Sequence, residues 1–238
     1  MQKRMIVVPQ LLDKGEDLVL SVNFETSEPR TAEATDKVQF LVDRGLQPSR
    51  DVTHGLGRVA LGDLLRRSAR RFPEKIAIVT PHGAITFGQL DEMANRCANM
   101  LRNEASKPGD RVATICSNSI EFIIVIFGIH KAGLVWVPIN PLISGDDRAY
   151  ILDHTEASIV IADAHVEDVI PSGTVGTPLV LVLGESFDAR LASASKVEPD
   201  LPIQERDLTM IMYTSGTTSR PKGVMHCNLA VYSTVMCN

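Results

Sequence analysis

Short apolar segments of strand length alternate with longer segments of helical character along most of this chain. The short segments are rich in β-branched residues and are bounded by Gly, Pro, Ser or Asn, as buried strands usually are. The expected strands cover residues 112–115, 135–138, 158–162, 179–183 and 208–213, and helices are expected at 120–132 and 144–154. Alternation of this kind needs crossover connections between parallel strands. We therefore expect an α/β fold with a mostly parallel sheet flanked by helices.

Local signals extend this pattern upstream. Residues 76–80 and 84–86 flank a Pro-His-Gly turn and predict a hairpin, and Thr86 and Gln89 form the ends of a T-x-x-Q capping box before an amphipathic helix. The first 57 residues differ, because a polar segment separates two short apolar stretches without a sustained period. We expect residues 1–57 to be an N-terminal extension and residues 58–238 to form the main domain.

Composition excludes several classes of function. The 24 basic and 29 acidic side chains are mixed along the chain, so no basic stripe predicts a nucleic-acid partner. The longest apolar run, residues 122–129, is far shorter than the roughly 20 residues that span a bilayer. The four cysteines lack C-x-x-C spacing, which argues against a zinc site and for reduced thiols. We expect a cytoplasmic protein without a transmembrane segment or bound structural metal.

The segment after the strand at 208–213 has the composition of an anion-binding loop. Its hydroxyl groups come from Thr214, Ser215, Thr217, Thr218 and Ser219. Gly216 lets backbone N–H groups approach a ligand, Lys222 adds a mobile positive charge, and Gly223 is expected to relax the backbone behind it. Phosphate oxygens need such convergent donors. A Walker A loop is disfavoured because Pro221 replaces its second glycine. On this chemistry alone, an ordinary turn is an open alternative.

The string YTSGTTSRPKGVMH, residues 213–226, resembles the signature loop of the adenylate-forming (AMP-binding) superfamily. The resemblance continues upstream through residues 109–143 and 85–101, and so covers roughly residue 61 onward. Fatty-acyl or related acyl-CoA ligases are the most similar branch. One departure is Ser219, where the family usually has glycine. The resemblance implies the N-terminal part of the family's large domain, with the sheet incomplete at the C-terminus after the phosphate loop.

The resemblance also implies a set of roles. The residues expected to hold the β- and γ-phosphates of MgATP are Thr214, Ser215, Gly216, Thr217, Thr218, Ser219 and Lys222. A carboxylic acid, expected to be a fatty or related acid, would attack the α-phosphorus, and the acyl-adenylate would pass to coenzyme A. The family places its magnesium-binding glutamate and its catalytic lysine after this loop, so this segment is expected to contain no catalytic or metal-binding residue. The resemblance thus implies acid–thiol ligase activity for the family. Because the family's catalytic lysine lies outside this segment, the segment alone is expected to be inactive.

Three hypotheses follow from that expectation. The first is a fragment of an acyl-CoA ligase, which is favoured. The second is a nucleotide-binding module in its own right. The third is an inactive interaction domain, or half of a split enzyme whose partner chain covers an exposed apolar edge.

The remaining candidate residues have structural interpretations. His130 is expected to be a helix-end cation or a core residue, and His226 to pack at the start of the helix after the loop. Asp146 and Asp147 match the acidic first turn of a helix. Trp136 is expected to pack against the sheet. His82 and His154 are expected on the surface, and residues 186–206 are expected to form a surface connection.

Overall fold

The computed structural model describes residues 2–8, 21–27, 59–81, 83–104, 107–214 and 220–237 of the chain. The chain forms two compact units, Met1–Leu56 and Gly57–Asn238. In the first unit, β1 (Gln2–Val8) pairs with β2 (Ser21–Ser27) as an antiparallel ladder. The second unit contains the sheet that the alternating pattern predicts, together with the helices around it.

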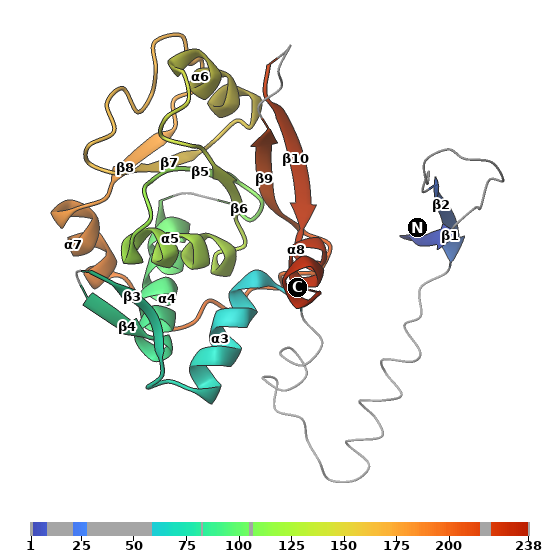
Figure 1. Ribbon diagram of the computed structural model, residues 1–238, viewed down its shortest axis with the longest axis horizontal. Coiled ribbons are helices and arrows are strands. Elements are labelled where there is room, and N and C mark those ends of the chain that lie inside the picture. Colours follow the sequence, from blue (N-terminus) through green and yellow to red (C-terminus); the bar gives the residue numbers. More distant parts are fainter. Residues whose placement is uncertain are drawn as a thin grey trace. The chain divides into compact units, whose positions relative to one another are not determined.

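The second unit is built on a six-stranded sheet in the order β10-β9-β6-β5-β7-β8 (Figure 1). The strands are β5 (Arg111–Ile115), β6 (Val135–Pro138), β7 (Ile159–Ala162), β8 (Leu179–Val182), β9 (Leu208–Thr214) and β10 (Lys222–Cys227). The first five of these run parallel, and β10 pairs antiparallel with β9. The expected α/β fold with a mostly parallel sheet is therefore confirmed.

Helices cover both faces of this sheet. One face carries α3 (Leu61–Arg71), α4 (Phe87–Asn103), α5 (Ile120–Lys131) and α7 (Glu185–Ser193), whose buried side chains share one core cluster. The other face carries α6 (Gly145–His154). The hairpin of β3 (Ile76–Thr80) and β4 (Gly83–Thr86) precedes α4, and α8 (Asn228–Met236) follows β10. Of the described helices, α6 is the one that packs on the face contributing to the site described below.

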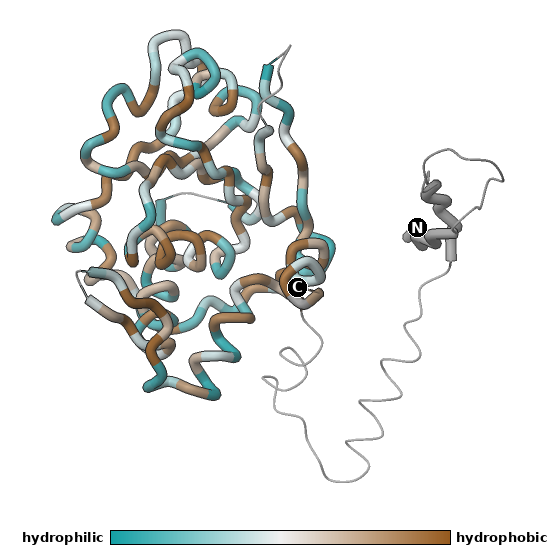
Figure 2. The backbone as a smooth tube through the Cα atoms, in the orientation of Figure 1, coloured by the Kyte–Doolittle hydropathy of each residue, from teal (hydrophilic) through white to brown (hydrophobic). Residues whose placement is uncertain are grey.

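The central strands explain why the sheet is buried on both sides. Val112 faces the core under α4 and α5, whereas the next residue, Ala113, faces the core under α6. In β7, Ile159 and Ile161 face the first core and Val160 faces the second. Side chains alternate across a strand, so continuous apolar runs are needed when both faces are covered. Figure 2 shows hydrophobic residues along these strands and along α5.

The cap signals in the sequence are present in the structure. Thr86 Oγ1 accepts the Gln89 N–H at 3.2 Å, and Gln89 Oε1 accepts the Thr86 N–H at 3.0 Å, which completes the capping box. Ser119 caps α5 by accepting the Phe122 N–H at 3.0 Å. Ser144 caps α6, whose first turn contains the expected acidic pair Asp146 and Asp147. These caps fix the starts of the three helices.

Two expectations about the last third of the chain are wrong. Residues 186–206 are not simply a surface connection, because α7 occupies the first part and buries Phe187 and Leu191 against α4 and the sheet. His226 does not start a helix but lies in β10, opposite Met210 of β9, and α8 begins only at Asn228. In the described residues, no helix combines the length and apolar character needed to cross a bilayer.

Candidate functional site

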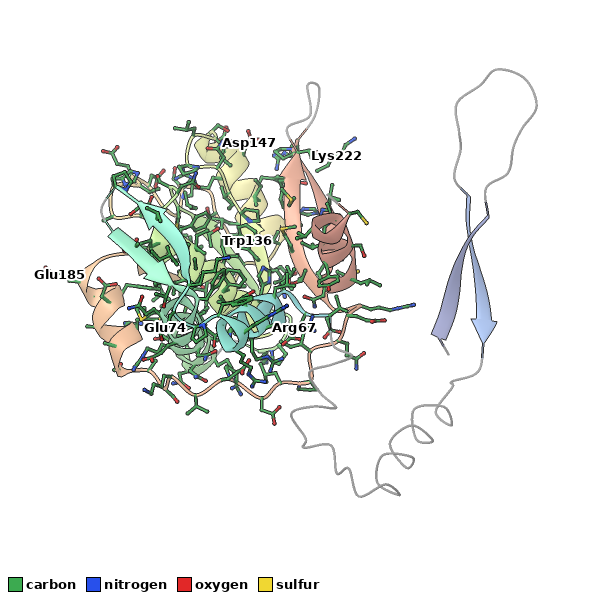
Figure 3. The ribbon with its side chains drawn as sticks, turned by 60° about the horizontal axis from the view of Figure 1, so that its bottom comes forward. Arg67, Glu74, Trp136, Asp147, Glu185 and Lys222 are labelled. Atoms are coloured by element: carbon green, nitrogen blue, oxygen red, sulfur yellow. The ribbon has the colours of Figure 1, made fainter. Side chains whose placement is uncertain are left out.

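The expected phosphate loop connects two strands that pair with each other. Thr214 ends β9 and lies opposite Lys222, which begins β10, so the two residues close the described part of this hairpin. Both side chains are exposed, and Figure 3 shows Lys222 at the end of the hairpin, away from the half-buried Trp136. Among described residues, Lys222 has no carboxylate within ion-pair distance. The expected ligands Ser215, Gly216, Thr217, Thr218 and Ser219 lie outside the described residues.

Gly223 has a spatial role that differs from the one expected. It lies opposite Tyr213 in the ladder, and a Cβ built on it would stand 3.0 Å from Tyr213 Cζ and 3.1 Å from Ile211 Cγ2. Its backbone φ is outside the left-handed region, so glycine is not needed here for backbone freedom. The missing side chain instead leaves room for the aromatic ring of Tyr213 across the hairpin.

The hydroxyl group of Tyr213 reaches α6 on the same face of the sheet. It lies 2.7 Å from Nδ1 of His154, which is exposed in the last turn of that helix. Burial, and secondarily the neighbouring Tyr150 phenol, raise the pKa of Tyr213 to about 12. The phenol therefore keeps its proton at neutral pH and can donate to a neutral imidazole. This hydrogen bond ties the residue before Thr214 to a helix 59 residues earlier in the sequence.

Tyr150 and Arg220 complete a group of four side chains, which we call the α6 cluster: Tyr150, His154, Tyr213 and Arg220. The Tyr150 ring stacks on the His154 ring with centroids 5.2 Å apart and an interplanar angle of 12°. The guanidinium carbon of Arg220 lies 4.9 Å from the Tyr150 ring centroid. His154 lies on the surface as expected, but the sequence did not predict this cluster. The four-residue spacing of Tyr150 and His154, which puts them on one helix face, was the available signal.

His130 is a core residue and not a helix-end cation. Only 5% of its surface is exposed, and burial lowers its pKa to about 4, so the imidazole is neutral at neutral pH. Its Nδ1 lies 2.9 Å from Thr209 Oγ1, and its ring meets Trp136 edge to face at 6.1 Å. Trp136 packs on the sheet as expected and donates to Thr114 Oγ1 at 2.9 Å. Neither side chain reaches the hairpin end that carries Thr214 and Lys222.

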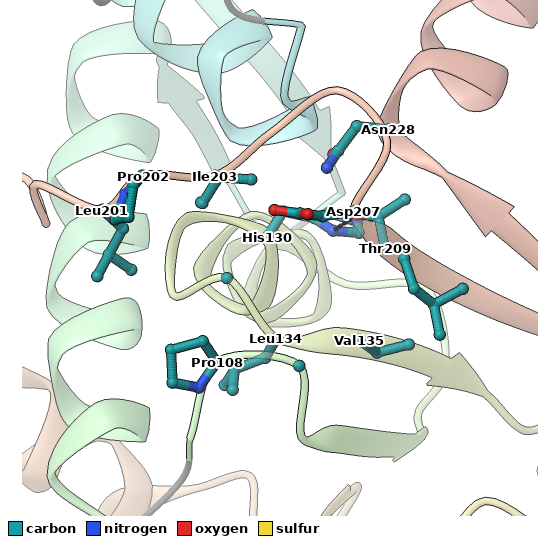
Figure 4. Close-up of a pocket in the computed structure, with 13 residues that line it drawn as sticks. Pro108, His130, Leu134, Val135, Leu201, Pro202, Ile203, Asp207, Thr209 and Asn228 are labelled. Atoms are coloured by element: carbon teal, nitrogen blue, oxygen red, sulfur yellow. Dashed lines mark hydrogen bonds between the residues drawn. The ribbon is translucent and has the colours of Figure 1, made fainter. Parts of the chain in front are cut away.

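A cavity of about 320 Å³ lies near the starts of β6 and β9 (Figure 4). It is at the opposite end of the sheet from Thr214, which ends β9. Its lining is mainly apolar, and its polar members bond to one another or to nearby backbone. Asn228 accepts the Leu61 N–H at 3.1 Å and donates to the Gln204 carbonyl at 3.1 Å. Asp207 accepts the Gln204 N–H at 2.8 Å. These bonds stabilise the connection between α3, β9 and α8, and they leave the hairpin end as the better candidate site.

The described residues contain no cluster of metal ligands, and two of the cysteines are buried. Within these ranges, no three His, Cys, Asp or Glu side chains come together as metal ligands. Burial raises the pKa of the Cys97 and Cys116 thiols to about 12, with the charge of Asp163 adding to the effect at Cys116. Both thiols therefore stay protonated and unreactive at neutral pH.

Comparison with known proteins agrees with the geometry. The family model for the AMP-binding enzyme matches residues 65–237. The long-chain-fatty-acid–CoA ligase FadD13 of Mycobacterium tuberculosis is 37% identical over 183 residues, which cover 73% of this chain and 36% of the relative. Tyrocidine synthase 2 of Brevibacillus parabrevis is 34% identical over 171 residues, which cover 71% of this chain and 4% of that protein.

A solved structure gives the same result in three dimensions. The inhibitor-bound N-terminal domain of FACL13 from Mycobacterium tuberculosis superposes with a TM-score of 0.65 at 36% identity, covering 71% of this chain and 44% of that one. The chain thus spans little more than a third of the length of the fatty-acyl-CoA ligase it matches. The family match and the shared fold extend over most of the second unit. The chain belongs to the AMP-binding enzyme family.

Proposed function

We propose that this chain supplies the phosphate-binding part of an enzyme that activates a carboxylic acid as its acyl-adenylate. The observation that carries the proposal is the β9–β10 hairpin, whose end presents the exposed Thr214 and Lys222 side chains opposite each other. In this proposal, residues 58–238 are the N-terminal part of an adenylation domain, and residues 1–57 are an extension.

The proposed phosphate ligands are Thr214, Ser215, Gly216, Thr217, Thr218, Ser219 and Lys222. The hydroxyl and N–H groups donate to the β- and γ-phosphate oxygens of ATP, and the Lys222 ammonium offsets the negative charge of the leaving pyrophosphate. These residues orient and stabilise the leaving group, with no covalent role. We assign no Mg²⁺ ligand to this segment, because the resemblance implies that the family's magnesium-binding glutamate follows the loop.

The substrate proposed first is a fatty or related acid, and coenzyme A is proposed as the acceptor of the activated acyl group. The fatty-acid–CoA ligase that matches at 37% identity supports this choice. Tyrocidine synthase 2 matches at 34%, so adenylation of a different acid for a different acceptor is the second candidate. The proposed activity is that of an acid–thiol ligase in the cytoplasm, and the chain alone is expected to be catalytically incomplete.

Two measurements on the purified chain test the proposal. The first is calorimetric titration with MgATP, for which micromolar to millimolar affinity is expected. Absence of binding across the millimolar range would remove the phosphate role. The second is carboxylate-dependent ATP–pyrophosphate exchange with fatty, aryl and amino acids. No exchange is expected, and exchange above background with any acid would refute the expected incompleteness while identifying the substrate.

We also infer that further polypeptide covers the exposed apolar side chains of β9, β10 and α8. Large apolar side chains are exposed on both faces of the hairpin and on α8: Met212 at 44% and Val224 at 44% on one face, Met225 at 68% on the other, and Val235 at 57% on the helix. Exposed large apolar side chains gathered in one region often mark an interaction surface. The longer relatives provide the candidate occupant, either as a continuation of the chain or as the second half of a split enzyme. Adding the corresponding two-thirds of the enzyme as a separate chain is expected to give a stable complex with exchange activity; no complex would refute the split arrangement.

A further inference from the structure

The α6 cluster connects both flanks of the proposed phosphate loop to one helix. Tyr213 precedes Thr214 and bonds to His154, whereas Arg220 lies two residues before Lys222 and rests on the Tyr150 ring. Because His154 and Tyr150 also stack on each other, the two attachments are joined. The same helix face therefore holds the chain on each side of the segment proposed to bind phosphate.

Tyr213 is held from three directions. Its hydroxyl group bonds to His154 at 2.7 Å, its ring packs against the core cluster that contains Ile115 and Val160, and Gly223 leaves space for the ring in the opposite strand. A side chain with packed ring and bonded hydroxyl has few alternative rotamers. The position of Thr214, the next residue, is therefore set by contacts that originate in α6 and in the sheet.

Arg220 is held in a way that leaves its charge available. It is exposed, and among described residues no carboxylate lies within 4 Å of its guanidinium group. Its contact is with the face of Tyr150, an interaction that uses the charge but does not consume the five N–H donors. Guanidinium groups bind phosphate oxygens in bidentate geometry. Arg220 is thus placed to be a second phosphate-binding cation beside Lys222.

We propose that Tyr150 and His154 are positioning residues for the phosphate site, and that Arg220, placed by Tyr150, binds the β- or γ-phosphate together with Lys222. This inference rests on the proposed function, since it assigns further residues to the same site. Tyr150 and His154 act through Arg220 and Tyr213 and do not themselves touch the nucleotide. The loss of either contact leaves the fold intact and lowers the affinity for the triphosphate, because more conformational freedom is then lost on binding.

The test measures the affinity of the full chain for MgATP, inorganic tripolyphosphate and AMP. Tyr150→Leu is expected to weaken binding of the first two by roughly three- to fivefold, while Tyr150→Phe, which keeps the ring, stays within about twofold of wild type. Arg220→Gln is expected to weaken both by about tenfold. AMP lacks the β- and γ-phosphates, so its affinity, where measurable, is expected to be unchanged in every variant.

A matched control variant and a double-mutant cycle separate this positioning role from a general loss of structure. Arg71 lies 5.1 Å over the Phe72 ring in another part of the unit, so Arg71→Gln removes an equivalent contact without affecting phosphate affinity. His154→Leu and Tyr213→Phe each remove one side of the hydrogen bond. Their effects on tripolyphosphate affinity are expected to be non-additive, with the double variant no weaker than either single one.

The possible outcomes distinguish the two proposals. If the wild-type chain binds neither MgATP nor tripolyphosphate, the phosphate function and this inference both fail. If the wild-type chain binds them and Tyr150→Leu and Arg220→Gln bind equally well, the inference alone is overturned. Weakening by Tyr150→Leu together with recovery in Tyr150→Phe supports it. Amide hydrogen exchange at Thr214 and Arg220 measures the mobility of the loop flanks without nucleotide. Exchange is expected to be faster in Tyr150→Leu than in wild type, and an unchanged rate would contradict the proposal that α6 holds these flanks.

Discussion

Gly223 occupies a position where any side chain meets an aromatic ring. Substitution with alanine places a methyl group 3.0 Å from Tyr213 Cζ, so the ring or the strand has to move. We expect Gly223→Ala to lower the free energy of unfolding by about 1–3 kcal/mol, measured by urea denaturation. Gly176→Ala is the control, because its Cβ meets only Asp153 Oδ1 at 3.6 Å, an ordinary contact. Equal stability of the two variants would show that Tyr213 moves without cost.

Lys222 is the charge on which the proposed phosphate site most depends. Its exposed position opposite Thr214 means that Lys222→Ala removes a cation without disturbing a buried contact. We expect MgATP affinity to fall by at least roughly tenfold, with the melting temperature unchanged. Lys107→Ala removes the same charge before β5, at the other end of the sheet, and is expected to leave affinity unaltered. Unchanged affinity in Lys222→Ala would exclude the assigned role.

At this scale, sequence reasoning found the residues of one segment but not their neighbours. Thr214 and Lys222 were recognised because they lie in one continuous string. His154 and Tyr213 are 59 residues apart, and their contact depends on which face of the sheet α6 covers. Helix periodicity gives the face shared by Tyr150 and His154 but not the strand it meets. Contacts of this kind follow from topology, which the local pattern does not specify.

At the scale of the element, α4 and α5 approach closely at a glycine. A Cβ on Gly128 of α5 would lie 2.5 Å from Cys97 Sγ and 2.6 Å from Cys97 Cβ. We expect Gly128→Ala to cost about 1–3 kcal/mol despite the higher helix propensity of alanine. Gly145, also in a helix, meets only Pro171 Cβ at 3.7 Å, so Gly145→Ala is expected to be neutral or slightly stabilising. Chemical denaturation of both variants measures the difference, and equal values would refute the packing argument.

A buried lysine joins three helices. The Lys131 side chain is 3% exposed, and its Nζ lies 2.8 Å from Asp91 Oδ1, 2.7 Å from Asn95 Oδ1 and 3.6 Å from Glu198 Oε1. Glu198 also pairs with Arg66 of α3 at 3.1 Å. Replacing one member of a buried ion pair leaves the other charge uncompensated.

Lys131→Met is therefore expected to lower the free energy of unfolding by about 3 kcal/mol. Lys196 lies 3.8 Å from Glu92 with 64% of its side chain exposed, so Lys196→Met is expected to change stability by less than about 0.5 kcal/mol. Thermal and urea unfolding of the two variants compare a buried pair with a surface pair. A Lys131→Met protein as stable as wild type would mean that the carboxylates rehydrate without cost.

Elements that the sequence predicted well have caps and continuous apolar stretches, whereas those it predicted poorly lack them. The helix expected at 120–132 has a serine cap and a continuous apolar stretch, and α5 matches it closely. In contrast, α7 has only Phe187 and Leu191 as buried anchors among Ser, Ala and Asp. Strand β10 has exposed residues over most of its length, so it lacks an alternating apolar pattern. Both elements are stabilised by tertiary contacts, which sequence periodicity does not report.

At the scale of the whole molecule, the buried neutral His130 makes stability depend on pH. The unfolded chain takes up a proton here near its usual pKa of 6.5, whereas the folded chain resists until about pH 4. Between these values the unfolded state binds more protons, so stability falls as the pH falls from about 6.5 to about 4. The contribution is complete above about 6.5 and has a slope approaching about 1.4 kcal/mol per pH unit within the window.

His130→Gln is expected to remove the part of the pH dependence of stability that comes from His130. The contributions of the other titrating groups are expected to remain. Denaturant unfolding at several pH values between 4 and 7 gives the slope for each protein, and their difference isolates His130. The variant is less stable than wild type at neutral pH because the contact with Thr209 changes, but the gap between them narrows as the pH falls. Parallel pH profiles for the two proteins would contradict a buried, neutral imidazole.

The strand order also has a consequence for synthesis on the ribosome. Strand β6 pairs with β5 on one side and with β9 on the other, yet the chain from Ile139 to Asp207 has to be translated before β9 emerges. At usual elongation rates this interval lasts several seconds, which is long compared with the closing of a loop. During that time, β5, β7 and β8 can assemble while one edge of β6 offers unpaired backbone groups to chaperones or to nascent neighbours. Slow codons within this stretch would prolong that exposure, so codon choice there is expected to govern how much of the chain is recovered folded.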